Sequence, residues 1–183
     1  SFETIHSGTL SGWHYAEFKR KSLNMPDHKK VLASIAAETD PTKLRKFREN
    51  AQRLGVAEVD DAAFRRLLEI LPEETPGSIE HDFWKTIHAF EEVLRDERGK
   101  TVRLSRTRQK IARVGVKQTL IDFATSKAPT DGFNMLIERG LPELTGEALV
   151  LKHSEHFDPA VLDAARSRLE GAGIDIAKLG ARK

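Results

Sequence analysis

Short apolar repeats with helical spacing, each bounded by a capping residue and by a glycine or proline, run through most of this chain. Asp40 followed by Pro41 is a typical helix start, because the aspartate side chain can accept a hydrogen bond from a free backbone N–H group and proline fits the first helical turn. Gly55 after Leu54 is a typical helix end. Segments this short bury their apolar faces against one another, and from Pro26 onward none alternates as a strand does. The chain is therefore predicted to be all-α.

The expected architecture is a multi-helix orthogonal bundle of about eight or nine short helices. Further helices are expected to begin at capping side chains, namely Ser78, Ser105, Thr130, Thr145 and Asp158. Helix ends are expected where a glycine follows an apolar repeat, namely at Gly99, at Gly140, and at Gly171 or Gly173. Gly115 is expected to interrupt or end the helix that begins at Ser105.

Residues 1–25 differ in composition from the rest of the chain. We expect them to form a non-helical N-terminal arm, or a linker from an upstream region of a longer protein. The stretch Pro-Glu-Glu-Thr-Pro-Gly at 72–77 is the best internal linker. It divides the remainder into a small helical lobe at 26–72 and a larger helical lobe at 78–183. One continuous domain over 26–183 is the alternative.

Composition excludes several classes of protein. The chain of 183 residues is 39% hydrophobic and 32% charged, and no apolar run approaches the ~20 residues of a membrane span. The first residues lack the basic and apolar regions of a signal peptide. Cysteine is absent, which excludes disulfides, thiolate metal sites and cysteine nucleophiles. We therefore expect a cytoplasmic protein with no membrane partner.

One stretch, which we call the basic segment (99–117), holds seven basic residues and no acidic residue. The preceding residues 73–98 hold eight acids and three bases, for a net charge of −5 against +7, while the whole chain carries only +2. Read as a helix, the segment places five bases on one side, namely Arg103, Arg106, Lys110, Arg113 and Lys117. Its apolar side, expected to dock on a core, is formed by Leu104, Thr107, Ile111 and Val114.

A cationic ridge of this kind suits the phosphates of a nucleic acid, with DNA favoured over RNA. The expected nucleic-acid contacts are Lys100, Arg103, Arg106, Arg108, Lys110, Arg113 and Lys117. A break at Gly115 would leave 105–114 and 116–126 as a helix-turn-helix-like pair. We therefore expect a nucleic-acid-binding helical domain, which could be part of a larger DNA-processing protein.

The alternative is a helical protein–protein interaction module. In that case acidic residues before the basic segment neutralise it within the chain, and the candidates are Glu91, Glu92, Asp96 and Glu97. A protein partner would then be recognised in an apolar groove between helices. The double substitution Arg106→Ala with Arg113→Ala distinguishes the two hypotheses. It should abolish binding in the first and lower thermal stability in the second.

The histidines are the remaining candidates for chemistry. His81 and His88 share a presumed helix face, and His153 and His156 are three residues apart, but neither pair matches a metal-binding motif. Histidine near a helix end complements the helix dipole, so solvated or capping roles are expected and no metal is assigned. No Gly-x-Ser-x-Gly motif is present, so no catalytic residue or cofactor is expected, and an enzyme is the least favoured class.

Overall fold

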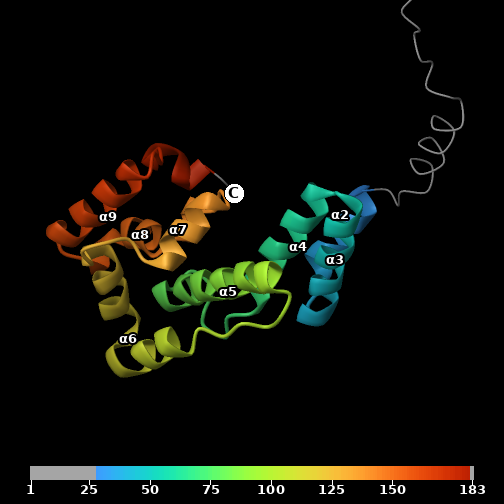
Figure 1. Cartoon of the computed structure of the whole chain (residues 1–183), viewed down its shortest axis with the longest axis horizontal. Helices are drawn as coiled ribbons and strands as arrows, with labels where there is room; N and C mark the ends of the chain where they lie inside the picture. Colours follow the sequence, from blue (N-terminus) through green and yellow to red (C-terminus); the bar gives the residue numbers. More distant parts are fainter. Residues whose placement is uncertain (1–27, 182–183) are drawn as a thin grey trace, which may run out of the picture. The chain divides into compact units, whose positions relative to one another are not determined.

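The computed structural model describes residues 28–181, and every regular element in that range is helical (Figure 1). The described residues form eight α-helices and three 3₁₀-helices, with no strand among them. The prediction of an all-α bundle is therefore confirmed for this part of the chain. The expected N-terminal arm at 1–25 lies outside the described residues. No helix in the described range combines the length and the apolarity that a membrane span requires.

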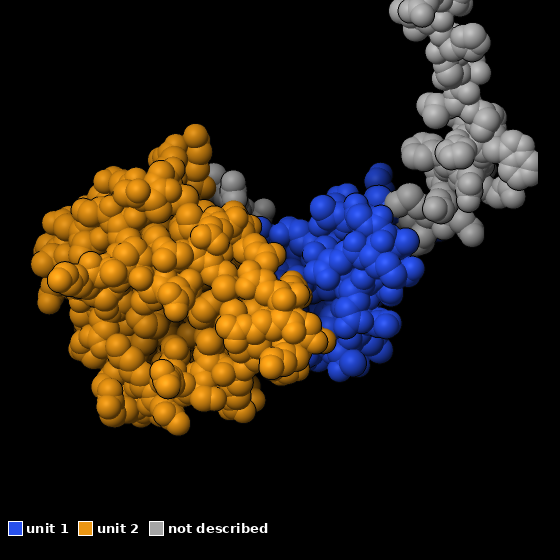
Figure 2. Space-filling view, in the orientation of Figure 1, with its two compact units in different colours: residues 1–67 blue, residues 68–183 orange. Residues whose placement is uncertain are grey.

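The chain divides into two compact units, residues 1–67 and 68–183 (Figure 2). The first unit contains α2 (His28–Ala37), α3 (Pro41–Leu54) and most of α4 (Ala57–Ile70). The division falls inside α4, a few residues before the linker expected at 72–77. The independence of the two lobes stays a prediction.

A buried arginine ties the helices of the first unit together. Arg48 of α3 is 6% exposed, and its Nε donates to Asp60 Oδ1 of α4 at 2.8 Å. Its guanidinium also lies over the Phe64 ring, 4.8 Å from the ring centroid. The predicted start of α3 is confirmed, because the Asp40 side chain accepts from the Thr42 N–H at 2.8 Å.

The second unit is built on five α-helices, namely α5 (Ile79–Arg98), α6 (Ser105–Thr125), α7 (Asp131–Glu138), α8 (Gly146–Lys152) and α9 (Pro159–Gly171). Three short 3₁₀-helices accompany them, namely η1 (Pro142–Leu144), η2 (Ser154–His156) and η3 (Ile176–Ala181). The short helix α8 packs against α5, α6 and α9, and its first five residues are buried. A helix of this length is unstable alone, so its contacts with the neighbouring helices must hold it in place.

The main core of this unit joins α5, α6, α8 and α9 through Phe83, Leu120, Val150 and Ala165, each fully buried. The helices α6 and α8 approach closely at Gly146. A Cβ atom added there would lie 3.1 Å from Cδ2 of Phe123. Glycine therefore permits this helix–helix contact.

Three of the predicted helix starts in this unit carry the expected side-chain caps. Ser78, Thr130 and Thr145 each accept a hydrogen bond from a backbone N–H three residues later, at 3.1, 3.1 and 3.2 Å. The prediction for Ser105 is wrong, because Ser105 is the first helical residue of α6 and makes no cap. Instead, the Glu91 carboxylate of α5 accepts a hydrogen bond from the Leu104 N–H at 2.8 Å. A residue of another helix therefore caps the start of α6.

Candidate nucleic-acid interface

The basic segment folds into the loop before α6 and the first half of that helix. Gly115 has φ 80° and ψ 170°, which breaks α6 into two arms, 105–114 and 116–125. The bend is visible in the olive ribbon of Figure 1. Arg103 precedes the helix and Lys117 lies beyond the break, so the expected five-residue ridge on one continuous helix is wrong. The predicted interruption at Gly115 is confirmed.

The apolar side of the segment packs only in part as expected. Ile111 and Val116 are buried at 8% and 9% exposure, and Leu104 packs on the main core. Val114 remains 37% exposed, so its predicted docking on the core is wrong. It is the last residue before the break, where the chain leaves its helical path.

Arg108 is held by α5. Its Nε and Nη2 donate to the two carboxylate oxygens of Glu91 at 2.9 and 2.7 Å, and its guanidinium lies over the Trp84 ring, 4.8 Å from the centroid. Burial raises the pKa of Glu91, but hydrogen bonds from His88, Arg108 and the Leu104 N–H lower it to about 2. The Glu91 carboxylate therefore stays ionised and fixes the start of α6.

Lys110 joins the two arms of α6. Its Nζ lies 2.6 Å from Asp122 Oδ2, and 5.7 Å from the centroid of the Phe123 ring. Hydrogen bonds from Lys110 and Gln118 lower the pKa of Asp122, and the nearby charge of Arg113 lowers it further. Two of the seven bases thus have carboxylate partners within the chain.

The other five bases of the segment lie on the surface. They make no ion pair with any carboxylate of the described residues, and they are Lys100, Arg103, Arg106, Arg113 and Lys117. We call these five residues the open cations.

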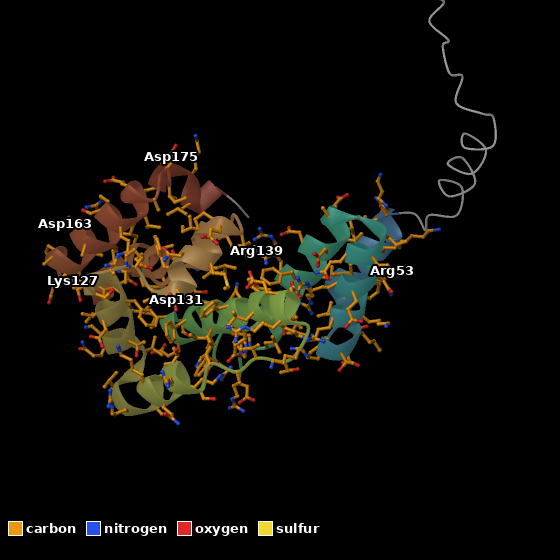
Figure 3. The ribbon with its side chains drawn as sticks, viewed as in Figure 1. Arg53, Lys127, Asp131, Arg139, Asp163 and Asp175 are labelled. Carbon is orange, nitrogen blue, oxygen red and sulfur yellow. The ribbon has the colours of Figure 1, made fainter. Side chains whose placement is uncertain are left out.

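Two of the α5 acids that were expected to neutralise the segment have other partners. Glu92 lies 3.6 Å from Arg95, and Glu97 lies 2.8 Å from Arg139, which follows α7 (Figure 3). Glu91, another of the four acids considered, forms the ion pair with Arg108 of the basic segment.

A groove of about 810 Å³ lies beside the open cations, within the second unit. Its apolar lining comes from α5, α6 and α7 and includes Phe90, Leu94, Phe123, Phe133 and Met135. Three arginines also line it, namely Arg98, Arg103 and Arg106. Two acids also line it, namely Asp131 at the start of α7 (Figure 3) and Glu147 of α8. The groove therefore combines an apolar surface with an excess of positive charge.

A second polar cluster lies at the end of α8. His153 is 7% exposed, and its Nε2 lies 2.7 Å from Asp82 Oδ2 on α5, which also accepts from Lys152 Nζ at 2.6 Å. Burial raises the pKa of Asp82, but the hydrogen bonds from Lys152 and His153 outweigh it and lower that pKa. His156, three residues on, has a half-exposed side chain. Of the two expected roles, the solvated one is wrong for His153, and the capping one is confirmed, because His153 is the C-cap residue of α8.

The side chains of His81 and His88 lie in different surroundings on α5. His81 is buried at 3% exposure, with Nδ1 3.8 Å from Asp82 Oδ1. His88 lies against Trp84 and Glu91 instead, and the centroid of its imidazole ring is 6.2 Å from the centroid of the Trp84 ring. The two side chains therefore serve different neighbours on α5.

The buried ion pair between Glu147 and Arg168 was not predicted from the sequence. Glu147 of α8 is 1% exposed, and its Oε1 accepts from Arg168 Nη1 of α9 at 3.0 Å. Arg168 also donates to the backbone oxygens of Phe123 and Ser126 at the end of α6. Burial raises the pKa of Glu147 despite the hydrogen bond from Arg168. This arginine links α6, α8 and α9. The one available signal was an acid inside the apolar run of α8.

No protein-family model, curated protein or solved structure matches this chain, so no relative's function can be transferred to it.

Proposed function

We propose that this chain binds nucleic acid, most simply DNA, through the open cations of the basic segment. The observation that carries the proposal is that five of the seven bases are exposed and form no ion pair in residues 28–181, Arg113 lying near enough to Asp122 to lower its pKa. Solvated bases that already have partners gain little from a polyanion, whereas unpaired ones can replace the counterions around its phosphates.

The first arm of α6 is the proposed centre of the contact. Arg106 and Arg113 are seven residues apart, which is two helical turns or about 10 Å along one side of a helix. Arginine at such positions can form bidentate contacts with different phosphates of one backbone. Arg103 precedes the arm and Lys117 follows the break, and each would add a phosphate contact in a helix-turn-helix-like pair.

Arg108 and Lys110 have a supporting role in this proposal. Both are committed to carboxylates, Glu91 and Asp122, and both side chains are partly covered. We therefore move them from the expected phosphate contacts to the residues that position the first arm. Contacts to phosphates alone give affinity without sequence discrimination.

The test is a fluorescence-anisotropy titration with labelled duplex DNA, single-stranded DNA and RNA. Arg106→Ala with Arg113→Ala should weaken binding at least tenfold while the thermal midpoint stays unchanged. A matched control removes two exposed bases elsewhere, Arg53→Ala with Lys127→Ala (Figure 3), and should bind like the parent chain. Equal loss in both variants, or no binding by the parent chain at low salt, would contradict the proposal.

The groove supports a second candidate function, a protein-interaction module whose partner is an acidic amphipathic helix. Its apolar lining would take the apolar face of that helix, and Arg98, Arg103 and Arg106 would pair with acids at its edges. Met135→Ser separates the two functions, because it removes apolar lining from the groove and leaves the charge of the open cations unchanged. It should abolish binding of such a peptide and leave DNA binding unchanged.

A further inference from the structure

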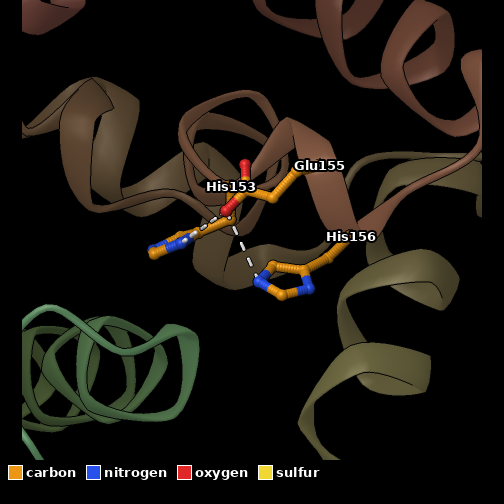
Figure 4. Close-up of side chains that lie close together, drawn as sticks. All are labelled: His153, Glu155 and His156. Atoms are coloured by element: carbon orange, nitrogen blue, oxygen red, sulfur yellow. Dashed lines mark ion pairs between the residues drawn. The ribbon is translucent and has the colours of Figure 1, made fainter.

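We propose that His153, Glu155 and His156 bind one divalent transition-metal ion, with Zn²⁺ the best match. This inference is independent of nucleic-acid binding and concerns the opposite end of α8 from the groove residues Gly146 and Glu147. The three side chains converge at η2 (Figure 4), and their ligand atoms all lie within 4.8 Å of one another. Two imidazoles and one carboxylate are a ligand set that zinc uses in sites with a fourth, open position.

The spacing of the ligand atoms fits a small tetrahedral ion. Glu155 Oε1 lies 3.4 Å from His156 Nε2 and 4.0 Å from His153 Nδ1. Bonds of ~2.0–2.1 Å to zinc place neighbouring ligand atoms about 3.4 Å apart in a tetrahedron. Side-chain rotation alone can close the remaining gap, because Glu155 and His156 are 65% and 48% exposed.

The buried histidine is already oriented as a metal ligand. Asp82 Oδ2, a carboxylate oxygen that can accept a hydrogen bond, lies 2.7 Å from His153 Nε2. A hydrogen on Nε2 would donate to it and leave the lone pair of Nδ1 for a metal ion. Nδ1 is the atom that faces Glu155. A carboxylate that binds the far nitrogen of a ligating histidine is the usual outer partner in zinc sites, since it fixes the ring and strengthens the ligand.

The chemistry of the donors selects the class of ion. Imidazole nitrogens suit zinc, copper and nickel, while calcium and magnesium prefer sites made of oxygen atoms. Glu155 contributes one negative charge, and the Lys152 ammonium lies on Asp82, outside the proposed ligands. The site should therefore bind Zn²⁺ and be indifferent to Ca²⁺ and Mg²⁺.

The test is isothermal titration calorimetry of the full chain with ZnCl₂, in the absence of nucleic acid. One equivalent should bind to the parent chain. Glu155→Ala and His156→Ala alter exposed side chains, so folding should be kept, and each should weaken binding at least tenfold. The matched control His28→Ala removes a histidine of the first unit and should bind zinc like the parent chain.

A third variant tests the outer partner. Asp82→Asn should weaken zinc binding by about 10–100-fold, and a thermal melt without metal checks that the variant is folded. The proposal is overturned if the parent chain takes up no zinc. It is also overturned if His28→Ala lowers the affinity as much as His156→Ala, or if Glu155→Ala and His156→Ala both keep the affinity of the parent chain.

Discussion

The guanidinium of Arg108 and the carboxylate of Glu91 form a two-point ion pair, with N–O distances of 2.9 and 2.7 Å, at the start of α6. The two side chains are 21% and 12% exposed, so water screens the pair less than it would screen a surface pair. The same carboxylate accepts from the Leu104 N–H. Arg108 therefore positions the start of α6, whereas the open cations of the basic segment lie on its surface.

Arg108→Ala should therefore destabilise the chain, whereas Arg106→Ala should leave its stability almost unchanged. Arg108→Ala leaves the half-buried Glu91 carboxylate without its main partner, and should lower the free energy of unfolding by about 1–3 kcal/mol. Arg106 is exposed and makes no ion pair in the described residues, so Arg106→Ala should stay within about 0.5 kcal/mol of the parent chain. Urea denaturation measures both. If Arg106→Ala is the more destabilising change, the positioning role of Arg108 is wrong.

The same ion pair predicts how stability depends on pH. Glu91 has its pKa lowered from 4.5 to about 2 in the folded chain, so folding favours the ionised form. The contribution of the ionised Glu91 to the free energy of unfolding is complete above pH 4.5 and is lost as the pH falls toward 2. Glu91→Gln should therefore show a smaller loss of stability than the parent chain between these values. Urea midpoints measured at several pH values for both chains give the difference, and parallel profiles would contradict this account.

Local signals predicted the helices well because helix starts depend on neighbouring residues. Asp40, Ser78, Thr130 and Thr145 each cap the N–H group of a residue two or three positions later, so the sequence alone identifies them. The prediction that Ser105 caps α6 was wrong because the Glu91 carboxylate of α5, 13 residues before Leu104, accepts the hydrogen bond at that helix start.

The candidate sites were less predictable because distant residues assemble them. His153 was expected to be solvated or to cap a helix, and its contact with Asp82, 71 positions away, could not be read from the sequence. All seven bases were expected to contact nucleic acid, yet Glu91 and Asp122 form ion pairs with Arg108 and Lys110. Charge counting finds such a segment, but it does not tell which members remain available for a partner.

Two glycines should respond differently to alanine. At Gly146 an added Cβ would lie 3.1 Å from Phe123 and 3.3 Å from Leu120, so those core side chains would have to shift. Gly146→Ala should cost about 1–3 kcal/mol. At Gly171, near the end of α9, the space around an added Cβ is open, and Gly171→Ala should be neutral or stabilise by about 0.4–1 kcal/mol. Thermal melts of the two variants check the contrast, and equal effects would argue against close packing of α6 on α8.

Arg168→Ala should be among the most destabilising single changes in the second unit. It strips the buried Glu147 carboxylate of its arginine and leaves the backbone oxygens of Phe123 and Ser126 without that donor. Breaking a buried pair in this way costs about 3–5 kcal/mol. The matched control is Arg166→Ala in the same helix, whose pair with Asp163 is exposed and should be worth ~0–1 kcal/mol. Similar unfolding free energies for the two variants would contradict the structural role of Arg168.

The salt dependence of DNA binding should report how many open cations reach phosphates. If all five do, the logarithm of the association constant falls with the logarithm of salt concentration with a slope of about −4 to −5. That slope corresponds to a loss of about 500-fold in affinity between about 50 and 200 mM salt. Arg106→Ala removes one contact and should make the slope shallower by about one. Arg108→Ala removes a charge that Glu91 already neutralises, so its slope should equal that of the parent chain. Anisotropy titrations at four salt concentrations measure all three slopes, and a shallower slope for Arg108→Ala would return that residue to the nucleic-acid contacts.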